Sequence, residues 1–188
     1  MATVTINNSP IHSQSSLSAV YGETGPNWAR FHTGIDFIPS GGTIANPLIY
    51  SVCVGEVVEV NLTPSASLGN NVVIKETATG LYWRYCHMVT GSVRVVLGDQ
   101  VNTGTVIGTM GATGNVTGVH LHLECATTQG WNYDTFVNPA VQLGIPNVRG
   151  TIVLYDGTIP PTPPVTNMKK KKFPWPVYAE KFRKRRFL

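Results

Sequence analysis

The segment TVIGTMGATGNVTGVHLHLEC, residues 105–125, contains two short apolar stretches joined by a turn rich in glycine. Its last six residues alternate strictly between a polar and an apolar set. The polar set is His120, His122 and Glu124, and the apolar set is Leu121, Leu123 and Cys125. Because successive side chains of a strand point to opposite faces, this alternation predicts a strand anchored in a core by its apolar face. The polar face then looks into a groove or, alternatively, is simply solvated.

The pattern of short strands continues on the N-terminal side of this segment. Residues 54–60 (VGEVVEV) predict a mixed strand between solvent and core. Residues 71–88 (NVVIKETATGLYWRYCHM) predict a hairpin that turns near residues 79–80, and residues 93–96 (VRVV) predict another strand. The region shows no helical periodicity. We therefore predict an all-β, small and mostly antiparallel sheet domain over residues 1–150.

The overall composition supports this fold class, and the lack of a long apolar run argues against a membrane span. Only 13% of the 188 residues are charged and 19 are glycine, a mixture that suits strands and tight turns. No run of about 18 apolar residues occurs, so we expect no membrane span. The first ten residues, MATVTINNSP, lack the basic and apolar regions of a secretory signal peptide. A substrate outside the cytoplasm would then be reached through a lysis pore or a virus particle.

The three cysteines, Cys53, Cys86 and Cys125, are an odd number without C-x-x-C spacing. In the absence of a signal peptide, we interpret them as reduced, partly buried apolar residues rather than as a disulfide framework. A role for one of them as a metal ligand stays open.

The net charge of +4 hides two regions of opposite sign. Residues 1–168 hold five Lys/Arg and nine Asp/Glu, a net charge of −4, while residues 169–188 hold nine Lys/Arg and one acid, a net charge of +8. We predict that residues 151–168, with the stretch IPPTPPV, form a stiff Pro-rich linker. The basic aromatic tail suits an anionic wall polymer or membrane surface, and nucleic acid less well. The alternative is a solvated extension.

Four of the five histidines lie in segments that can build one polar site. Two of them, His120 and His122, are two residues apart and share one face of a strand. Imidazole is a common metal ligand, although such pairs also occur without a metal.

The segment HTGID, residues 32–36, adds a histidine and an aspartate four residues apart. Gly34 allows a bend that brings them together, and both are good ligands for first-row metals. Alternatively, they are a turn histidine and a capping aspartate. His32, Asp36 and one histidine of the pair would supply three ligands, the number typical of catalytic zinc, which keeps a fourth position for water. The spacing does not decide which member of the pair binds.

His87 and the remaining member of the pair are then available for catalysis. A non-ligand imidazole beside zinc can accept a proton from water or stabilise a developing oxyanion. Trp83 and Tyr85 have the same parity as His87 on the strand. They wall a substrate groove or pack in the core.

Three motifs in this order, HTGID, YCHM and GATGNVTGVHLHLE, resemble the lysostaphin-type (LytM-like) zinc endopeptidases, and so does LGDQVNTGTVIGTMGATG. The resemblance covers about residues 15–142. Cys86 stands where a small residue such as alanine is common, Met88 where leucine is usual, and Leu123 where phenylalanine is usual. None of these departures removes a histidine or the aspartate. Glu124 either orients a ligand from behind or is a plain surface carboxylate.

The resemblance implies a small antiparallel β fold with its site in a groove between loops. It implies that Zn2+ is held by His32, Asp36 and His122, and that His87 and His120 are the catalytic histidines that do not bind metal. The substrate it implies is the peptide stem or cross-bridge of bacterial peptidoglycan.

A peptidase domain with a proline linker, a basic tail and no signal peptide resembles a bacteriophage lytic protein. We expect an endolysin that stays in the host cytoplasm until a holin releases it, or a virion-associated lysin that opens the wall. The alternative is a catalytically silent wall-binding or structural virion component with the same fold. A third hypothesis is a tail that acts on membranes without zinc.

Overall fold

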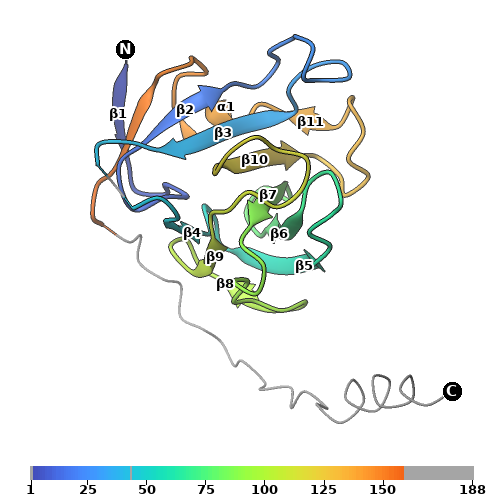
Figure 1. Ribbon diagram of the computed structural model, residues 1–188. Helices are drawn as coiled ribbons and strands as arrows, with labels where there is room; N and C mark the ends of the chain where they lie inside the picture. The colour runs from blue at the N-terminus through green and yellow to red at the C-terminus, as the bar shows by residue number, and fades with distance from the viewer. Residues whose placement is uncertain (1, 43, 159–188) are drawn as a thin grey trace, which may run out of the picture.

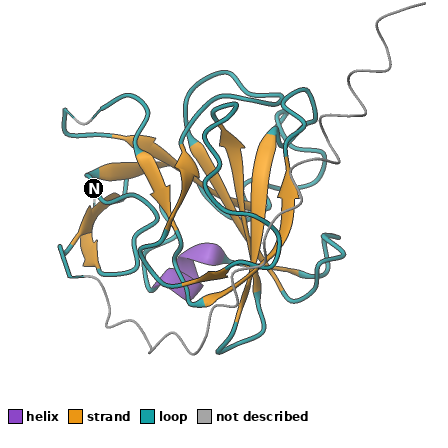
Figure 2. Cartoon of the chain, turned by 90° about the horizontal axis from the view of Figure 1, so that it is seen from below, coloured by secondary structure: helices purple, strands orange, loops and turns teal. Residues whose placement is uncertain are grey.

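Strands make up nearly all the regular structure in the computed structural model of the protein, which describes residues 2–42 and 44–158. The strands are β1 (Thr3–Ile6), β2 (Ser15–Ala19), β3 (Gly34–Pro39), β4 (Leu48–Tyr50), β5 (Gly55–Asn61), β6 (Asn70–Glu76), β7 (Tyr82–Met88), β8 (Gln100–Val101), β9 (Val106–Thr109), β10 (Leu121–Ala126), β11 (Phe136–Val137) and β12 (Ile152–Tyr155). One short helix, α1 (Pro139–Leu143), contacts β3 and β10 (Figures 1 and 2).

The main sheet has the strand order β1-β12-β2-β3-β10-β7-β6-β5-β8, with β11 paired to β10, while β4 and β9 form a separate two-stranded sheet (Figure 1). All its pairs are antiparallel except β1 with β12. The predicted all-β, mostly antiparallel class is therefore confirmed. The central strand β10 lies between β3 and β7, so polar residues from three strands can meet on one face.

The alternation in β10 is confirmed, but both of its faces are buried. Leu121, Leu123 and Cys125 have no exposed surface and belong to the hydrophobic core. On the opposite face, His122 and Glu124 are only 6% and 1% exposed. The polar side chains are therefore held inside the protein rather than solvated, and burial of that kind requires partners for them.

One sequence prediction about an element is wrong. Residues 93–96 form no strand, because Arg94 N–H donates to Ile107 O but Val96 bonds to Asp99 in a turn, through its N–H to the carboxylate and its carbonyl to the Asp99 N–H. The short helix α1 is only five residues long, too short to show helical periodicity in the sequence. Its boundaries come from capping, since the Asn138 side chain accepts from Ala140 N–H and Gly144 ends it in the left-handed region.

The predicted start of the linker needs correction. Residues 152–155 form β12, which lies between β1 and β2 in the sheet and places the apolar side chain of Val153 in the core. The rest of the linker from residue 159, and the basic tail at 169–188, lie outside the described residues and stay predictions. Within residues 2–42 and 44–158, no helix has the length and apolar character needed to cross a membrane.

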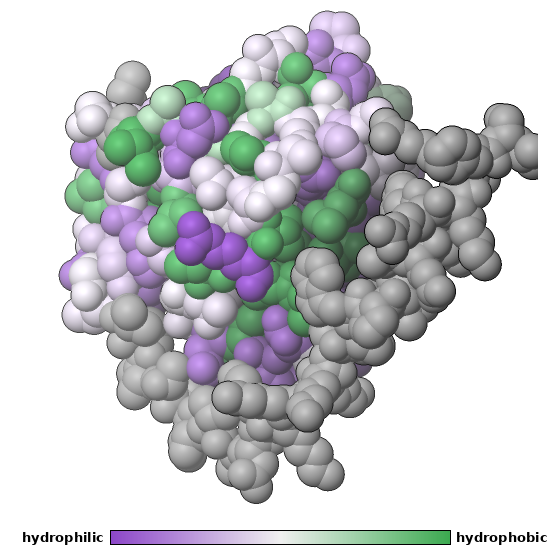
Figure 3. All heavy atoms as spheres, turned by 60° about the horizontal axis from the view of Figure 1, so that its bottom comes forward, coloured by the Kyte–Doolittle hydropathy of each residue, from purple (hydrophilic) through white to green (hydrophobic). Residues whose placement is uncertain are grey.

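The three cysteines are free and buried, as expected for small apolar residues. Burial raises the pKa of Cys53 to about 12 and that of Cys86 well above its ordinary value. Such thiols are inert near neutral pH. The face drawn in Figure 3 carries both hydrophobic and hydrophilic residues, and exposed apolar side chains such as Leu62 are common on the surface of folded proteins.

The fifth histidine, His12, lies in an aromatic stack away from the other four. Its ring is sandwiched between Tyr50 of β4 and Tyr155 of β12, with centroids 3.5 and 3.8 Å away and rings nearly parallel. The stack therefore joins the small sheet to an outer strand of the main sheet. Burial lowers the pKa of His12 below its ordinary value.

We expect this stack to make stability depend on pH. The folded protein resists protonation of His12, while the unfolded chain binds that proton near pH 6.5, roughly. The contribution of the neutral ring is thus present above that pH and is lost as the pH falls. In urea unfolding, wild type should lose more stability on acidification than His12→Phe, which keeps an aromatic ring in the stack. Equal losses in both proteins would contradict this expectation.

Candidate active site

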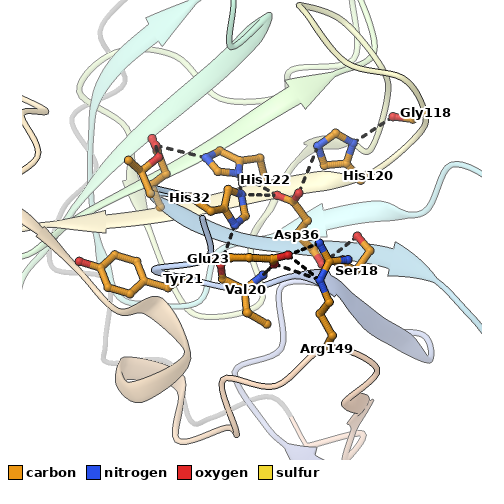
Figure 4. A network of polar contacts seen from close by, with 12 residues as sticks. Ser18, Val20, Tyr21, Glu23, His32, Asp36, Gly118, His120, His122 and Arg149 are labelled. Atoms are coloured by element: carbon orange, nitrogen blue, oxygen red, sulfur yellow. Dashed lines mark hydrogen bonds and ion pairs between the residues drawn. The ribbon is translucent and has the colours of Figure 1, made fainter. Parts of the chain in front are cut away.

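Three donor atoms from β10, β3 and the loop before β3 converge on one point. His32 Nε2 lies 3.2 Å from Asp36 Oδ1 and 3.0 Å from His122 Nδ1, and His122 Nδ1 lies 2.8 Å from Asp36 Oδ1 (Figure 4). The antiparallel register causes this, because His122 on β10 is paired directly with Asp36 on β3. Among the described residues, these three form the group of histidine, cysteine and acidic side chains that could hold a metal ion.

The donor set fits a tetrahedral first-row metal. Ligands about 2.0–2.1 Å from a tetrahedral zinc are separated by about 3.3 Å, close to the three separations found here. Two imidazoles and one carboxylate also leave one position of a tetrahedron free, as catalytic rather than structural sites do.

Each histidine of this cluster is oriented by its second ring nitrogen. His32 Nδ1 lies 2.9 Å from the Val20 carbonyl, so its N–H donates there and Nε2 keeps its lone pair for the cluster. His122 Nε2 lies 3.2 Å from Glu124 Oε1, which leaves Nδ1 facing Asp36. A hydrogen bond at one nitrogen fixes the tautomer and the ring orientation at the other, as is usual for metal-bound histidine.

Glu124 is a buried carboxylate behind His122 and not a surface residue. Besides His122, it accepts hydrogen bonds from Thr33 Oγ1 at 2.5 Å and from Arg84 Nε at 2.5 Å. Arg84 is its directly paired neighbour on β7, and Trp131 covers the guanidinium at 3.8 Å. Although burial raises the pKa of Glu124, these partners outweigh it and lower the pKa to about 2. These contacts therefore support the interpretation that Glu124 orients His122, and not the alternative of a surface carboxylate.

The charged groups of the cluster shift each other's pKa strongly. Burial raises the pKa of Asp36, but hydrogen bonds from His122 and His32 hold it well below its ordinary value. Burial lowers the pKa of His122, but Asp36 and Glu124 raise it to about 10. Without a metal, the two carboxylates thus stabilise a proton on His122. A cation at the cluster would take the place of that proton.

Gly34 is needed for close packing rather than for a bend. It lies in the extended strand β3, paired with Glu124, so the predicted bend at this residue is wrong. A Cβ at Gly34 would come within 2.4 Å of Leu123 O and 2.9 Å of His122 Cε1. A side chain there would push the His122 ring away from the cluster.

His87 lies beside the cluster in a strained backbone conformation. Its φ of 64° is in the left-handed region, which costs of order 1–3 kcal/mol for a residue other than glycine. Two neighbouring loops hold it there, since its N–H donates to Leu68 O and its Nδ1 lies 2.8 Å from Thr113 O. Burial lowers the pKa of His87 to about 4. Near neutral pH its Nε2 therefore offers a lone pair to the groove.

His120 completes the polar wall from the residue just before β10. Its Nδ1 lies 2.9 Å from Gly118 O, and its Nε2 points toward Asp36 Oδ2 at 4.0 Å (Figure 4). The rings of His87 and His120 are 4.7 Å apart. Both histidines thus present Nε2 on the same side, next to the cluster but outside it.

The glycine-rich motif packs two loops against each other around His87. Thr113 Oγ1 donates to Met88 O and accepts from Asn70 N–H, while Gly114 N–H donates to Pro64 O. A Cβ at Gly114 would lie 2.5 Å from Ser67 O, and its φ of 93° disfavours any other residue. The motif is required because these backbones touch.

A groove of about 570 Å³ contains all five predicted site residues. Its walls come from the loop before β3, the loop before β6 and the loop before β10. The lining residues are Pro26, Asn27, Trp28, His32, Thr33, Asp36, Ser67, Leu68, His87, Asn115, Val116, Thr117, His120 and His122. Trp83 and Tyr85 instead pack in the core, and the Tyr85 hydroxyl accepts from Val52 N–H. Trp28, whose ring centroid lies 5.0 Å from that of His32, also lines the groove, and no motif in the sequence predicted it there.

A small antiparallel β domain whose groove gathers two histidines and one aspartate has the architecture of a metallopeptidase. The model of "Peptidase family M23" matches residues 30–139, and the chain belongs to this family. The predicted lysostaphin-type resemblance is thereby confirmed.

Individual relatives are consistent with this assignment. Endolysin 2638A of Staphylococcus phage 2638A is 36% identical over 111 residues, which are 55% of this chain and 21% of the endolysin. The catalytic domain of the antimicrobial peptidase lysostaphin from Staphylococcus simulans has a TM-score of 0.54 and 26% identity, over 71% of this chain and 92% of that one. A zinc-containing peptidase from Vibrio cholerae has a TM-score of 0.52 and 30% identity, over 64% of this chain and 36% of that one. The chain spans 21% to 33% of the length of the curated relatives it matches.

Proposed function

We propose that the protein is a zinc-dependent endopeptidase that hydrolyses amide bonds in the peptide stem or cross-bridge of bacterial peptidoglycan. The observation that carries the proposal is the convergence of three donor atoms in a groove, with two further histidines directly beside them. Membership of peptidase family M23 and the likeness to lysostaphin support the reaction and the substrate class.

In this proposal, His32, Asp36 and His122 hold the zinc. The donor chemistry and separations suit that metal, and the related Vibrio cholerae peptidase contains zinc. Zinc bound by three protein ligands lowers the pKa of a water and polarises a carbonyl group.

His87 and His120 act on protons and charge in the groove. With Nδ1–H bound to a backbone carbonyl, each ring offers Nε2 to a water or to the peptide. Burial keeps the His87 ring neutral near neutral pH, so its Nε2 lone pair can accept a hydrogen bond from the attacking water. Once protonated, either ring can donate a hydrogen bond to the oxyanion or a proton to the leaving amine.

We further propose that the protein serves phage-mediated wall degradation, as an endolysin or a virion-associated lysin. The match to a staphylococcal phage endolysin supports a phage context. The protein would then reach the wall after its release from the host cytoplasm or through delivery with the virion.

The proposal is tested by digestion of purified peptidoglycan, with mass spectrometry of the products. Zinc-loaded protein should release fragments with new peptide amino termini and intact glycan strands, and a chelator should stop the release until zinc is restored. Zinc-loaded protein that binds the wall but releases no amino termini would support the silent wall-binding alternative. Lysis that persists in chelator and requires residues 169–188 would support the membrane-active tail.

Glu124→Ala should weaken both the fold and the metal site. Removing the carboxylate leaves Arg84 buried without its partner, which costs about 3–5 kcal/mol. It also releases His122 Nε2, and loss of such a partner typically lowers metal affinity about 10–100-fold. Urea unfolding in chelator and zinc titration measure the two effects separately. Glu124→Gln, which keeps an acceptor oxygen, should bind zinc more tightly than Glu124→Ala; equal affinities for wild type and both variants would contradict the orienting role.

A further inference from the structure

The segment between β2 and β3, residues 20–33, carries both His32 and the groove wall. Its two arms are joined by backbone bonds, from Gly22 N–H to His32 O at 2.9 Å and from His32 N–H to Glu23 O at 2.8 Å. Trp28, at the tip, lines the groove. The position of His32 therefore depends on what holds residues 20–23.

Arg149, which lies between α1 and β12, binds the base of this segment through an ion pair and hydrogen bonds. Its Nε lies 2.8 Å from Glu23 Oε1 and 3.0 Å from Oε2, and its Nη2 lies 2.5 Å from Oε1. Its Nη1 donates to Ser18 O on β2 (Figure 4). A forked guanidinium is suited to such simultaneous contacts, whereas an ammonium group is not.

A second contact from the same C-terminal stretch reinforces the first. The Asn147 side chain accepts from Tyr21 N–H at 3.1 Å and donates to Tyr21 O at 2.9 Å. The residues that follow α1 thus bind Ser18, Tyr21 and Glu23 together. We refer to Asn147, Arg149 and Glu23 as the clamp.

A short series of hydrogen bonds connects the clamp to the donor cluster of His32, Asp36 and His122. Glu23 Oε2 accepts from Val20 N–H at 3.3 Å, and Val20 O accepts from His32 Nδ1–H at 2.9 Å. His32 Nε2, on the far side of the same ring, faces Asp36 and His122. Figure 4 shows this path from Arg149 to Asp36.

We propose that the clamp is a positioning device which sets the orientation of His32 and thereby the affinity of the site for its metal. Arg149, Asn147 and Glu23 all lie outside residues 30–139, the part of the chain matched by the family. The proposal rests on the proposed function, because it requires that His32 binds zinc. It assigns residues near the C-terminal end of the described domain to the metal centre, although none of them touches the metal ligands.

The test compares wild type, Arg149→Ala, Arg149→Lys and Glu23→Ala in zinc competition titrations. Arg149→Ala should raise the dissociation constant for zinc about tenfold, the low end of the range for a residue behind a ligand. Arg149→Lys should fall between Arg149→Ala and wild type. The double variant Arg149→Ala/Glu23→Ala should be no weaker than the weaker single variant, because both changes break the same path. Arg94→Ala, which removes another exposed arginine, is the matched control and should bind zinc like wild type.

An NMR readout separates positioning from a general loss of stability. In the zinc-loaded protein, the His32 Nδ1 proton should exchange with water faster in Arg149→Ala than in wild type, because its bond to Val20 O would open more often. The variant should fold, because the Arg149 side chain is 54% exposed. Unchanged zinc affinity and unchanged proton exchange would overturn the clamp, even if the free energy of unfolding falls. Wild type that binds no zinc would overturn the metal site together with the clamp, so the two failures are distinguishable.

Discussion

Asp36→Ala should abolish zinc binding and lower peptide hydrolysis at least about a thousandfold, equivalent to about 4 kcal/mol of transition-state stabilisation. Asp36 Oδ1 is the atom that both His32 Nε2 and His122 Nδ1 face, so its removal leaves two imidazoles without the carboxylate that neutralises the cation. Two neutral ligands hold zinc far less well than three ligands with a negative charge. Metal content after dialysis and the rate of amino-terminus release measure the effect.

The control for this variant is Asp134→Ala, which removes an exposed carboxylate from the loop before β11. It should keep both zinc and activity. The Asp36 side chain is partly exposed, so its variant should still fold, and urea unfolding checks this. An Asp36→Ala protein with one tightly bound zinc would contradict the ligand assignment.

His87→Ala should separate metal binding from turnover. Because His87 lies beside the donor cluster and not in it, the variant should retain its zinc. Its turnover should fall about 10²- to 10⁴-fold, the usual contribution of a positioned acid or base. The loss should appear in kcat and not in the dissociation constant for zinc.

His120→Ala should behave in the same way, since the two imidazoles share one side of the groove. His12→Phe is the matched control, because His12 lies outside the groove. A His87 or His120 variant that binds zinc and cleaves as fast as wild type would refute the proposed roles of these histidines.

The local pattern of the sequence predicted β10 well because both of its faces are specified. Leu121, Leu123 and Cys125 require a core, and the alternating polar set cannot be placed there without partners. Residue spacing could not predict which of His120 and His122 lies in the donor cluster with His32 and Asp36. That choice depends on the register between β10 and β3, which pairs His122 with Asp36 across 86 residues of sequence and leaves His120 before the strand.

Other parts of the site were out of reach because they act through the backbone or through distant pairing. The backbone carbonyls of Val20 and Thr113 orient His32 and His87, respectively. Every residue has such a carbonyl, so the sequence does not show which one a histidine will bind. Glu124 could not be distinguished from a surface carboxylate until its pairing with Arg84 on β7 was known. The helix α1 was missed for a different reason, since it is too short for periodicity and only its Asn-Pro start and Gly end identify it.

His32, Asp36 and His122 should together hold one zinc ion, and X-ray absorption spectroscopy of the zinc-loaded protein measures this coordination. We predict one zinc per chain with only nitrogen and oxygen neighbours at about 2.0–2.1 Å, including the scattering pattern of two imidazoles. A sulfur neighbour at about 2.3 Å would instead indicate a cysteine ligand, and no stoichiometric zinc would indicate no such site. Either result would show that these three residues do not hold a zinc ion together.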